Sequence, residues 1–357
     1  MGLKVKFKSQ QEVNGIKKII LNLALPATIF IALLGIKVEA SLLLLPLMAL
    51  LLNVLLFTVS PFLLPIVGVK KKTPAYRTAR LLIPSLAPGL SCFPFVLEFL
   101  GEAYLAKAAM ADLGNKVFVL LILYLIAMHW FYARNQEMRT GGRAKLISLL
   151  KTLVTEPVNL FIGLAILFLS FGINTQSLPF VISDTLSKLS LMMTPLVLLF
   201  IGLAVKIKKK QFLQILSLLL MRAGLVFFIT ALFVAISGLQ LQNDMLLMLS
   251  FGLSACSFWP FAHLSLVDGL ELEKKSKTFD SNYAVAILAL SFPLSTTLIL
   301  GVLNSGALLV PTMNIFLAGL ALVLLGSIFP FIKLLSKKAS KLHLSETQME
   351  TTTAEGA

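Results

Sequence analysis

The stretch Leu90-Ser91-Cys92-Phe93-Pro94-Phe95 lies within an apolar segment, residues 81–100, that is long enough to cross a bilayer as a helix. A proline inside such a helix removes a backbone donor and interrupts the helix. A similar stretch, Ser257-Phe258-Trp259-Pro260-Phe261, lies in a second apolar segment, residues 246–267. Prolines in corresponding spans of two halves are typical of a transporter's binding site near the middle of the membrane. Two unrelated proline kinks are the alternative, because proline is common in membrane helices.

The composition predicts an all-α polytopic membrane protein. Of the 357 residues, 58% are hydrophobic and 13% are charged, whereas soluble domains average about 45–50% apolar and about 25% charged residues. The N-terminal region lacks the charged start, short apolar core and cleavage site of a signal peptide, so we expect the first span to remain as a structural helix. Cys92 and Cys256 both fall in apolar spans. We expect them to be free and inert, and we expect no metal site and no cofactor.

Ten apolar segments are predicted to be transmembrane helices, numbered here as spans one to ten. They are residues 19–38, 41–67, 81–100, 116–133, 157–173, 189–205, 211–237, 245–267, 281–303 and 311–335. Residues 102–112 are expected to form a short helix that continues from span three. The polar, threonine-rich tail, residues 342–357, is expected to be disordered.

The placement of basic residues supports this count. One side of the predicted membrane, which includes both termini, has 26 of the 31 lysines and arginines, whereas the other side has only Lys37, Lys107, Lys116 and Lys188. Arg222 lies within span seven. Because cytoplasmic loops are enriched in lysine and arginine, this asymmetry predicts that both termini lie in the cytoplasm. The net charge of +15 is thus explained by topology, and we expect no binding to nucleic acid.

The two halves of the chain are predicted to form an inverted-topology repeat. Span three enters from the side that span eight leaves, and both contain the proline motif. Setting Pro94 on Pro260 matches Ser91 with Ser257, and spans one to four with spans six to nine. Span five then has no partner before span one. Span ten is the candidate partner, because both spans begin with a proline that an asparagine closely follows, in Pro157-Val158-Asn159 and Pro311-Thr312-Met313-Asn314; an unrelated added helix is the alternative.

Several segments resemble the auxin efflux carrier family of permeases, whose fold is similar to that of the bile-acid/sodium symporters. The matching segments are Leu23 to Phe30, Leu82-Ile83-Pro84 through Gly101, Glu156-Pro157 through Ile173, Pro195 through Gly202, and Ser254 through Pro293. The family often has Asn-Thr-Gly before its first crossing proline, where this chain has Ala87-Pro88-Gly89.

The resemblance implies two crossed broken helices near the midplane, a small organic anion as substrate, and an elevator-like or rocking exchange of access. It also implies a division into scaffold and core. The scaffold would comprise residues 1–40, 152–210 and 305–341 (spans one, five, six and ten), and the transport core would comprise residues 41–151 and 211–304. The expected partners are the anion, the lipid bilayer of the cell (inner) membrane, and a second copy bound through the scaffold.

The candidate site residues follow from the helix breaks and from polar groups in apolar spans, which are costly there unless they have a role. The substrate-binding candidates are Ser91, Cys92, Pro94, Ser257, Trp259, Pro260, Asn282 and Arg222. The candidates for coupling to sodium or protons are Glu98, His263, Asp268 and Ser291.

Each ionisable candidate also has a structural interpretation. Arg222 lies about three turns from Lys210, so snorkelling to the cytoplasmic interface is the preferred interpretation. For His263, a hydrogen bond between helices explains the residue as well as titration does. Solvated helix ends explain Glu98 and Asp268 equally well.

Two other function classes are open. An intramembrane enzyme is disfavoured because the chain lacks a His-Glu-x-x-His zinc motif and a Gly-x-Ser-x-Gly elbow, and we expect no enzymatic activity. A lipid flippase or assembly factor need not have matching helix breaks, so the repeat disfavours it only mildly.

Overall fold

The computed structural model describes residues 10–34, 44–134, 157–204, 209–239, 241–271 and 277–332, and these ranges contain helices and turns but no strand. The predicted disordered tail and most of the first basic cluster lie outside the described residues. Five described helices are long and apolar enough to cross a membrane: Leu44–Ile66, Met110–Arg134, Gln211–Ser237, Ser281–Leu309 and Thr312–Ile332. Large side chains on the outer surface are exposed, such as Phe62, Phe180 and Phe331. A surface this apolar suits hydrocarbon rather than water.

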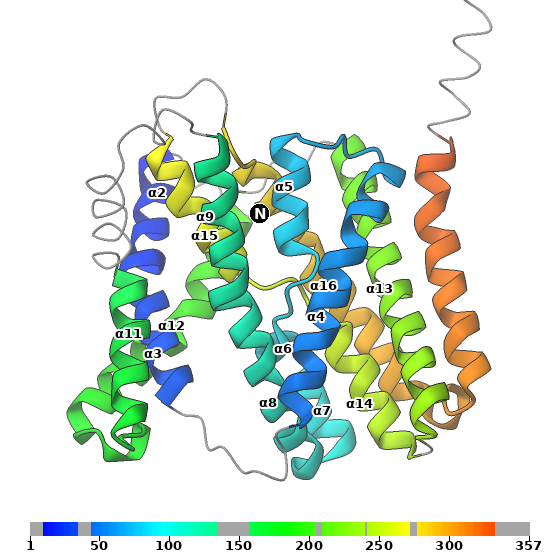
Figure 1. Cartoon of the computed structure of the whole chain (residues 1–357), viewed down its shortest axis with the longest axis horizontal. Coiled ribbons are helices and arrows are strands. Elements are labelled where there is room, and N and C mark those ends of the chain that lie inside the picture. The colour runs from blue at the N-terminus through cyan, green and yellow to red at the C-terminus, as the bar shows by residue number, and fades with distance from the viewer. Residues whose placement is uncertain are drawn as a thin grey trace, which may run out of the picture.

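The elements follow one another along the chain, and each of the ten predicted spans coincides with one or more of them (Figure 1). In order they are α2 (Gln10–Ile19), η1 (Ile20–Ala24), α3 (Leu25–Leu34), α4 (Leu44–Ile66), α5 (Pro74–Leu82), α6 (Pro88–Ser91), α7 (Phe93–Leu100), α8 (Glu102–Val117), η3 (Phe118–Ile122), α9 (Leu123–Arg134), α11 (Pro157–Ser170), η5 (Thr175–Ser177), α12 (Phe180–Ala204), α13 (Lys209–Ser237), α14 (Gln242–Gly252), α15 (Trp259–Leu270), α16 (Ser281–Ser305), η6 (Gly306–Leu309) and the C-terminal helix Thr312–Ile332.

Two turns, at opposite ends of the bundle, reverse the direction of the chain. Gly101 adopts φ +90°, a conformation that glycine tolerates and other residues rarely adopt. The chain reverses there, so residues 102–112 start α8 instead of continuing span three, and that prediction was wrong. At the other end of the bundle, Lys70, Lys71 and Lys72 lie exposed in the turn between α4 and α5.

The π-helical turn η1 has a local cause. Pro26 follows η1 by two residues; it has no N–H, and its ring clashes with the carbonyl four residues earlier. The hydrogen bonding in span one widens from the α to the π pattern just before this proline, which keeps α2, η1 and α3 in one continuous segment.

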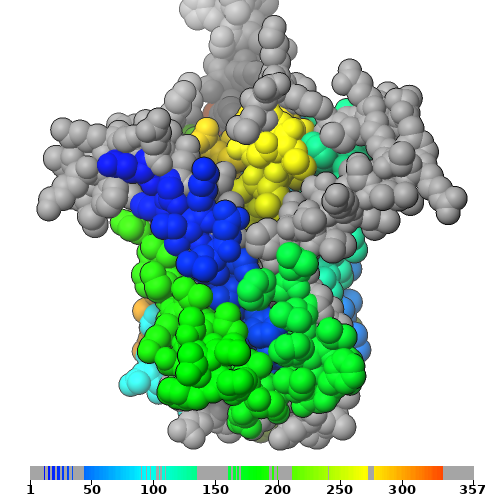
Figure 2. Space-filling view, turned by 90° about the vertical axis from the view of Figure 1, so that its left-hand side faces the viewer, coloured from blue at the N-terminus to red at the C-terminus, as the bar shows by residue number. Residues whose placement is uncertain are grey.

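One group of helices forms the left-hand side of the bundle in Figure 1. There α3 packs between α11 and α12, and Figure 2 shows residues of α2 and α3 in blue beside the green surface of α11 and α12. Phe30 packs edge-to-face against Phe161 and Phe168, with ring centroids 5.7 Å apart in both pairs. Spans one, five and six thus pack together, and their assignment to a scaffold stays a prediction.

Span ten does not join that group. The helix Thr312–Ile332 lies at the opposite side of the bundle, against α13 (Figure 1). Its glycines allow this close approach: a Cβ on Gly319 would lie 3.1 Å from the Gly224 carbonyl oxygen. The Ser217 hydroxyl also donates a hydrogen bond to the Gly326 carbonyl. Small residues are typical of helix contacts in membranes. Span ten thus packs on α13, apart from the group of α3, α11 and α12, and its assignment to the scaffold stays a prediction.

Candidate functional site

The predicted interruptions of spans three and eight are present in the structure. Between α5 and α6 the chain is non-helical at residues 83–87, here called the first break. Between α14 and α15 it is non-helical at residues 253–258, the second break. In Figure 1 the segment α5–α6–α7 descends through the bundle, whereas α14–α15 ascends. The two interrupted segments therefore run in opposite directions.

The breaks do not begin at the two prolines that drew attention to them. Pro94 is the second residue of α7, and Pro260 is the second residue of α15. A proline in the first turn of a helix loses no intrahelical hydrogen bond, because the N–H groups there have no partner within the helix. The prolines thus start helices. The first break lies before Pro88, at Ile83 to Ala87, and only the turn at Cys92 directly precedes α7.

The two breaks are hydrogen-bonded to each other. The backbone N–H of Ala87 donates to the Ala255 carbonyl at 2.8 Å. The N–H of Ser257 donates to the Ser85 hydroxyl at 3.0 Å, and the N–H of Ala255 donates to the Ser91 hydroxyl at 2.9 Å. Buried non-helical backbone must find its hydrogen-bond partners within the protein, because an unpaired buried N–H or C=O group costs free energy. The serines therefore replace the helical partners that the breaks have lost.

Arg222 of α13 connects both breaks from one side. Its Nε donates to the Ile83 carbonyl at 2.8 Å, and its Nη2 donates to the Ser254 carbonyl at 2.9 Å and to the Ser85 carbonyl at 3.4 Å. The residue is only 3% exposed. The preferred interpretation that Arg222 snorkels to the interface was wrong, because the guanidinium reaches inward. Among the described residues, no carboxylate forms an ion pair with it.

A buried polar network supports the first break from the other side. On α8, Asn115 donates through Nδ2 to the Leu86 carbonyl at 3.0 Å and accepts the Leu86 N–H at 3.3 Å. The same amide accepts a hydrogen bond from Asn53 of α4 and donates one to Asp112. All three polar side chains are buried. Asn115 thus pairs with both backbone groups of Leu86, as a neighbouring peptide would.

The network was missed by sequence reasoning, although a signal for it existed. Asn53 is a polar residue in the middle of an apolar span, which is a functional candidate by default. Asp112 was the last residue of the short helix expected at residues 102–112, and Asn115 preceded the expected start of span four at residue 116. Asp112 also pairs with Lys116, at 3.4 Å.

Of the remaining candidates for substrate binding and coupling, some lie at or next to the breaks and others are exposed. Ser291 of α16 lies at the second break, where its hydroxyl accepts the Cys256 N–H at 3.2 Å. Cys92 and Cys256 are free and buried, and Trp259 is half-buried at the start of α15. In contrast, Asn282 and Glu98 are exposed.

His263 makes the interhelical hydrogen bond that was the alternative to titration. Its Nε2 lies 2.8 Å from the Val119 carbonyl in the π-helical turn η3. A carbonyl only accepts hydrogen bonds, so Nε2 must carry the proton. A π turn leaves carbonyl groups out of the regular helical pattern, and His263 satisfies one of them.

The place where the two breaks meet is called the crossing, and Asp268 lies outside it, in a cluster where α15 meets α16. It forms an ion pair with Lys277 and accepts a hydrogen bond from Ser281. Nearby, Arg77 donates to the Thr278 carbonyl at 2.7 Å. Burial and the charge of Arg134 lower the pKa of Arg77 to about 10, and Glu271 opposes this shift. These contacts join Lys277, Thr278 and Ser281, at the start of α16, to α15 and α5.

Comparison of the sequence with protein-family models and with curated proteins gives no match. The resemblance to the auxin efflux carrier family therefore rests on the residues quoted above, and the function must be inferred from the geometry.

Proposed function

We propose that this chain is a secondary active transporter that moves a small organic anion across the cell membrane by alternating access. In this proposal all ten segments span the membrane, both termini are cytoplasmic, and the two crossed breaks form the substrate site. The observation that carries it is the direct hydrogen bonding between two interrupted helices of opposite direction.

An inverted repeat is supported by the reciprocity of two of these bonds. When residue 83 is set on residue 253, Ala87 corresponds to Ser257 and Ser85 corresponds to Ala255. The bond from the Ala87 N–H to the Ala255 carbonyl and the bond from the Ser257 N–H to the Ser85 hydroxyl then join equivalent positions, although one acceptor is a backbone carbonyl and the other a side-chain hydroxyl. This is the pattern expected for two-fold related repeats in the membrane plane. The register differs by four residues from the one set by Pro94 and Pro260.

The charge at the crossing favours an anion. Arg222 is buried and has carbonyl partners but, among the described residues, no ion-paired carboxylate. α15 begins at the second break with its N-terminal end, which carries partial positive charge. Both features attract a carboxylate or a similar group. Asp112, which reaches the first break through Asn115, is a further acidic candidate for sodium or proton coupling, in addition to Glu98 and Asp268.

The arrangement of helices suits a relative movement of two bodies. Leu196 and Leu199 of α12 are apolar side chains that pack against a buried cluster that contains Ile20 and Ala24 of span one as well as residues of the central helices. Apolar contacts without a fixed hydrogen-bond pattern allow one body to slide or rock against the other, and this is the movement that alternating access requires.

Flux measurements with the purified protein in proteoliposomes test the proposal. A panel of small carboxylates would be offered with imposed sodium or proton gradients, and at least one is expected to accumulate above the level in empty vesicles. Ser91→Ala with Ser257→Ala should reduce that uptake several-fold, whereas Lys188→Ala, at an exposed ion pair on α12, should not. If no gradient drives any anion, or if the double variant transports at the wild-type rate, the proposal is wrong.

A further inference from the structure

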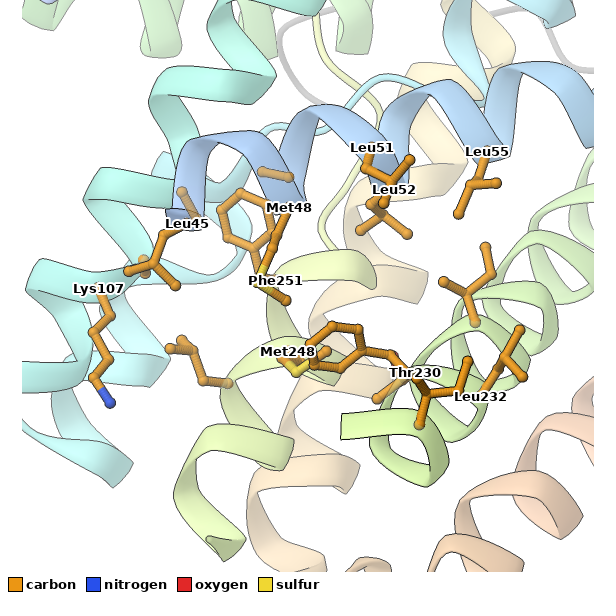
Figure 3. Close-up of a pocket in the computed structure, with 17 residues that line it drawn as sticks. Leu45, Met48, Leu51, Leu52, Leu55, Lys107, Thr230, Leu232, Met248 and Phe251 are labelled. Carbon is orange, nitrogen blue, oxygen red and sulfur yellow. The ribbon is translucent and has the colours of Figure 1, made fainter. Parts of the chain in front are cut away.

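A cavity of about 260 Å³ lies away from the hydrogen bonds of the crossing, between α4, α8, α13 and α14 (Figure 3). Its walls are built almost entirely from leucine, isoleucine, methionine, phenylalanine and alanine side chains. Thr230 and Lys107 are the polar residues of the lining. A wall of this composition has no groups with which to orient a polar substrate, so its occupant must be apolar.

The cavity opens towards the outer apolar surface of the bundle. Four of its lining residues are themselves well exposed: Leu51 by 55% and Leu55 by 36% on α4, and Leu232 by 63% and Ile236 by 78% on α13. These side chains form the two rims, and they belong to helices with the length and hydropathy of membrane spans. In a bilayer the opening therefore faces lipid.

One end of the cavity is marked by charge. Lys107 lines this end, and its Nζ pairs with Asp244 at the start of α14, 2.7 Å away. The starts of α8 and α14 lie at the end of the bundle opposite the basic turn between α4 and α5 (Figure 1). Ionised groups that are partly exposed belong at the membrane–water interface. The cavity therefore extends from an interface into the depth of the hydrocarbon layer, as a lipid chain does.

We propose that this cavity binds an acyl chain of a membrane phospholipid. Water does not fill an apolar space of this kind, and an empty space forfeits the dispersion contacts of its walls. A neighbouring acyl chain supplies those contacts without leaving the bilayer. Met48 and Met248 face each other across the space in Figure 3, and their flexible thioethers adapt to the shape of a mobile chain.

The chain would contact the helix that leads into the second break. Phe251 lines the cavity and is followed by Gly252, the last residue of α14. A Cβ on Gly252 would lie 2.6 Å from a Val226 methyl carbon of α13 and 3.4 Å from one of Leu52 on α4, so α14 ends tightly wedged between the helices that form the rims. An acyl chain between α4 and α13 therefore braces α14 one turn before the crossing. This inference requires a membrane location but no transport activity.

Thermal unfolding in detergent tests the proposal, since a molecule that binds the folded state alone raises its apparent stability. Adding dipalmitoyl phosphatidylglycerol to delipidated protein should raise the Tm by roughly a few degrees, and glycerophosphoglycerol, which lacks the chains, should not. Ala111→Phe, which fills the cavity from α8, should abolish most of that increase. Leu125→Phe, at an exposed site on α9 outside the cavity, should retain it. An Ala111→Phe protein with the full increase would overturn the proposal.

Photolabelling of the wild-type protein tests the acyl-chain proposal even if the Ala111→Phe protein does not fold. Phosphatidylglycerol with a photoreactive group near the end of one chain would be incorporated into nanodiscs with the wild-type protein. Labels should concentrate on the peptides that contain Met48, Met248 and Phe251. If instead they are spread evenly over exposed apolar helices, including Thr312–Ile332, the chain has no site and the proposal fails.

Discussion

The backbone N–H of Ser257 lies 3.0 Å from the hydroxyl oxygen of Ser85, and the two residues come from interrupted helices that run in opposite directions. The same Ser85 hydroxyl donates to the Leu82 carbonyl at the end of α5, 2.6 Å away. One serine thus satisfies the end of its own helix and the backbone of the other break. The crossing is therefore a hydrogen-bonded unit, and each break depends on the other for its partners.

Cross-linking tests this contact directly. In a Cys92→Ala/Cys256→Ala background, Ser85→Cys together with Ser257→Cys should be joined by mercuric ion or by oxidation, because the Ser257 backbone nitrogen lies 3.0 Å from the Ser85 side-chain oxygen and disulfides join residues whose Cα atoms are about 4.4–6.8 Å apart. A protease site inserted beside Asn174 allows the result to be read on a denaturing gel, where the two fragments migrate together only when a covalent cross-link joins them. Ser85→Cys with Ser305→Cys is the control pair. Fragments that separate despite reactive thiols at both positions would contradict the crossing.

Replacement of Arg222 should destabilise the protein more than loss of a surface charge does. Arg222→Met removes the donors to the carbonyls of Ile83, Ser85 and Ser254. Each buried carbonyl left without a partner costs about 1–3 kcal/mol, so the loss exceeds the gain from no longer burying a charge. Arg222→Lys should recover only part of the loss, because an ammonium group cannot reproduce the fork of a guanidinium. The measurement is the Tm, and equal Tm values for wild type and Arg222→Met would refute this role.

The sequence could predict the two interruptions but not how they are stabilised. The prolines and the order of the spans can be read from the sequence alone, and they indicated correctly that spans three and eight are interrupted. The partners of the breaks come from other helices: Arg222 from α13, Asn115 from α8 and Ser291 from α16. Nothing in the neighbourhood of Arg222 in the chain distinguishes an inward guanidinium from one that snorkels. The direction of that side chain depends on carbonyls far away in sequence.

The position of span ten could not be predicted from the sequence for a related reason. Its Pro-x-x-Asn-like start suggested a relationship to span five, but a helix is positioned by the face that it packs. That face contains Gly319 and Gly326, which match Gly224 and Ser217 of α13. The small residues spaced along span ten indicate its packing face, and they are a stronger signal than the sequence at the start of the helix.

Asn115→Leu should destabilise the first break. Leucine has a similar volume but leaves the N–H and the carbonyl of Leu86 without partners, along with an amide nitrogen of Asn53. At about 1–3 kcal/mol for each unsatisfied buried group, the variant should unfold several degrees below wild type. Asn304→Leu, at an exposed amide on α16, is the matched control. Hydrogen exchange at residues 83–87 should also accelerate in the variant. Unchanged protection there would mean that Asn115 does not support the break.

His263 should not determine the pH dependence of any transport. Its Nε2–H is needed as a donor to the Val119 carbonyl, and the amide of a glutamine can supply an N–H in its place. We therefore expect His263→Gln to fold and to show the wild-type pH profile of uptake, whereas His263→Phe should lose stability. A shift of the pH optimum in the glutamine variant would instead assign proton coupling to this residue.

Replacement by alanine is expected to have opposite effects on stability at Gly319 and at Gly301. The comparison tests the position of the C-terminal helix. A Cβ on Gly319 would lie 2.9 Å from the Phe227 Cβ and 3.1 Å from the Gly224 carbonyl oxygen, so Gly319→Ala forces the helix away from α13. A Cβ on Gly301 of α16 would have no heavy atom within 4 Å, and alanine there should be neutral or stabilising by up to about 1 kcal/mol because of its higher helix propensity. The Tm should therefore fall for Gly319→Ala and hold or rise for Gly301→Ala. A Gly319→Ala protein as stable as wild type would show that Thr312–Ile332 does not pack on α13 in this way.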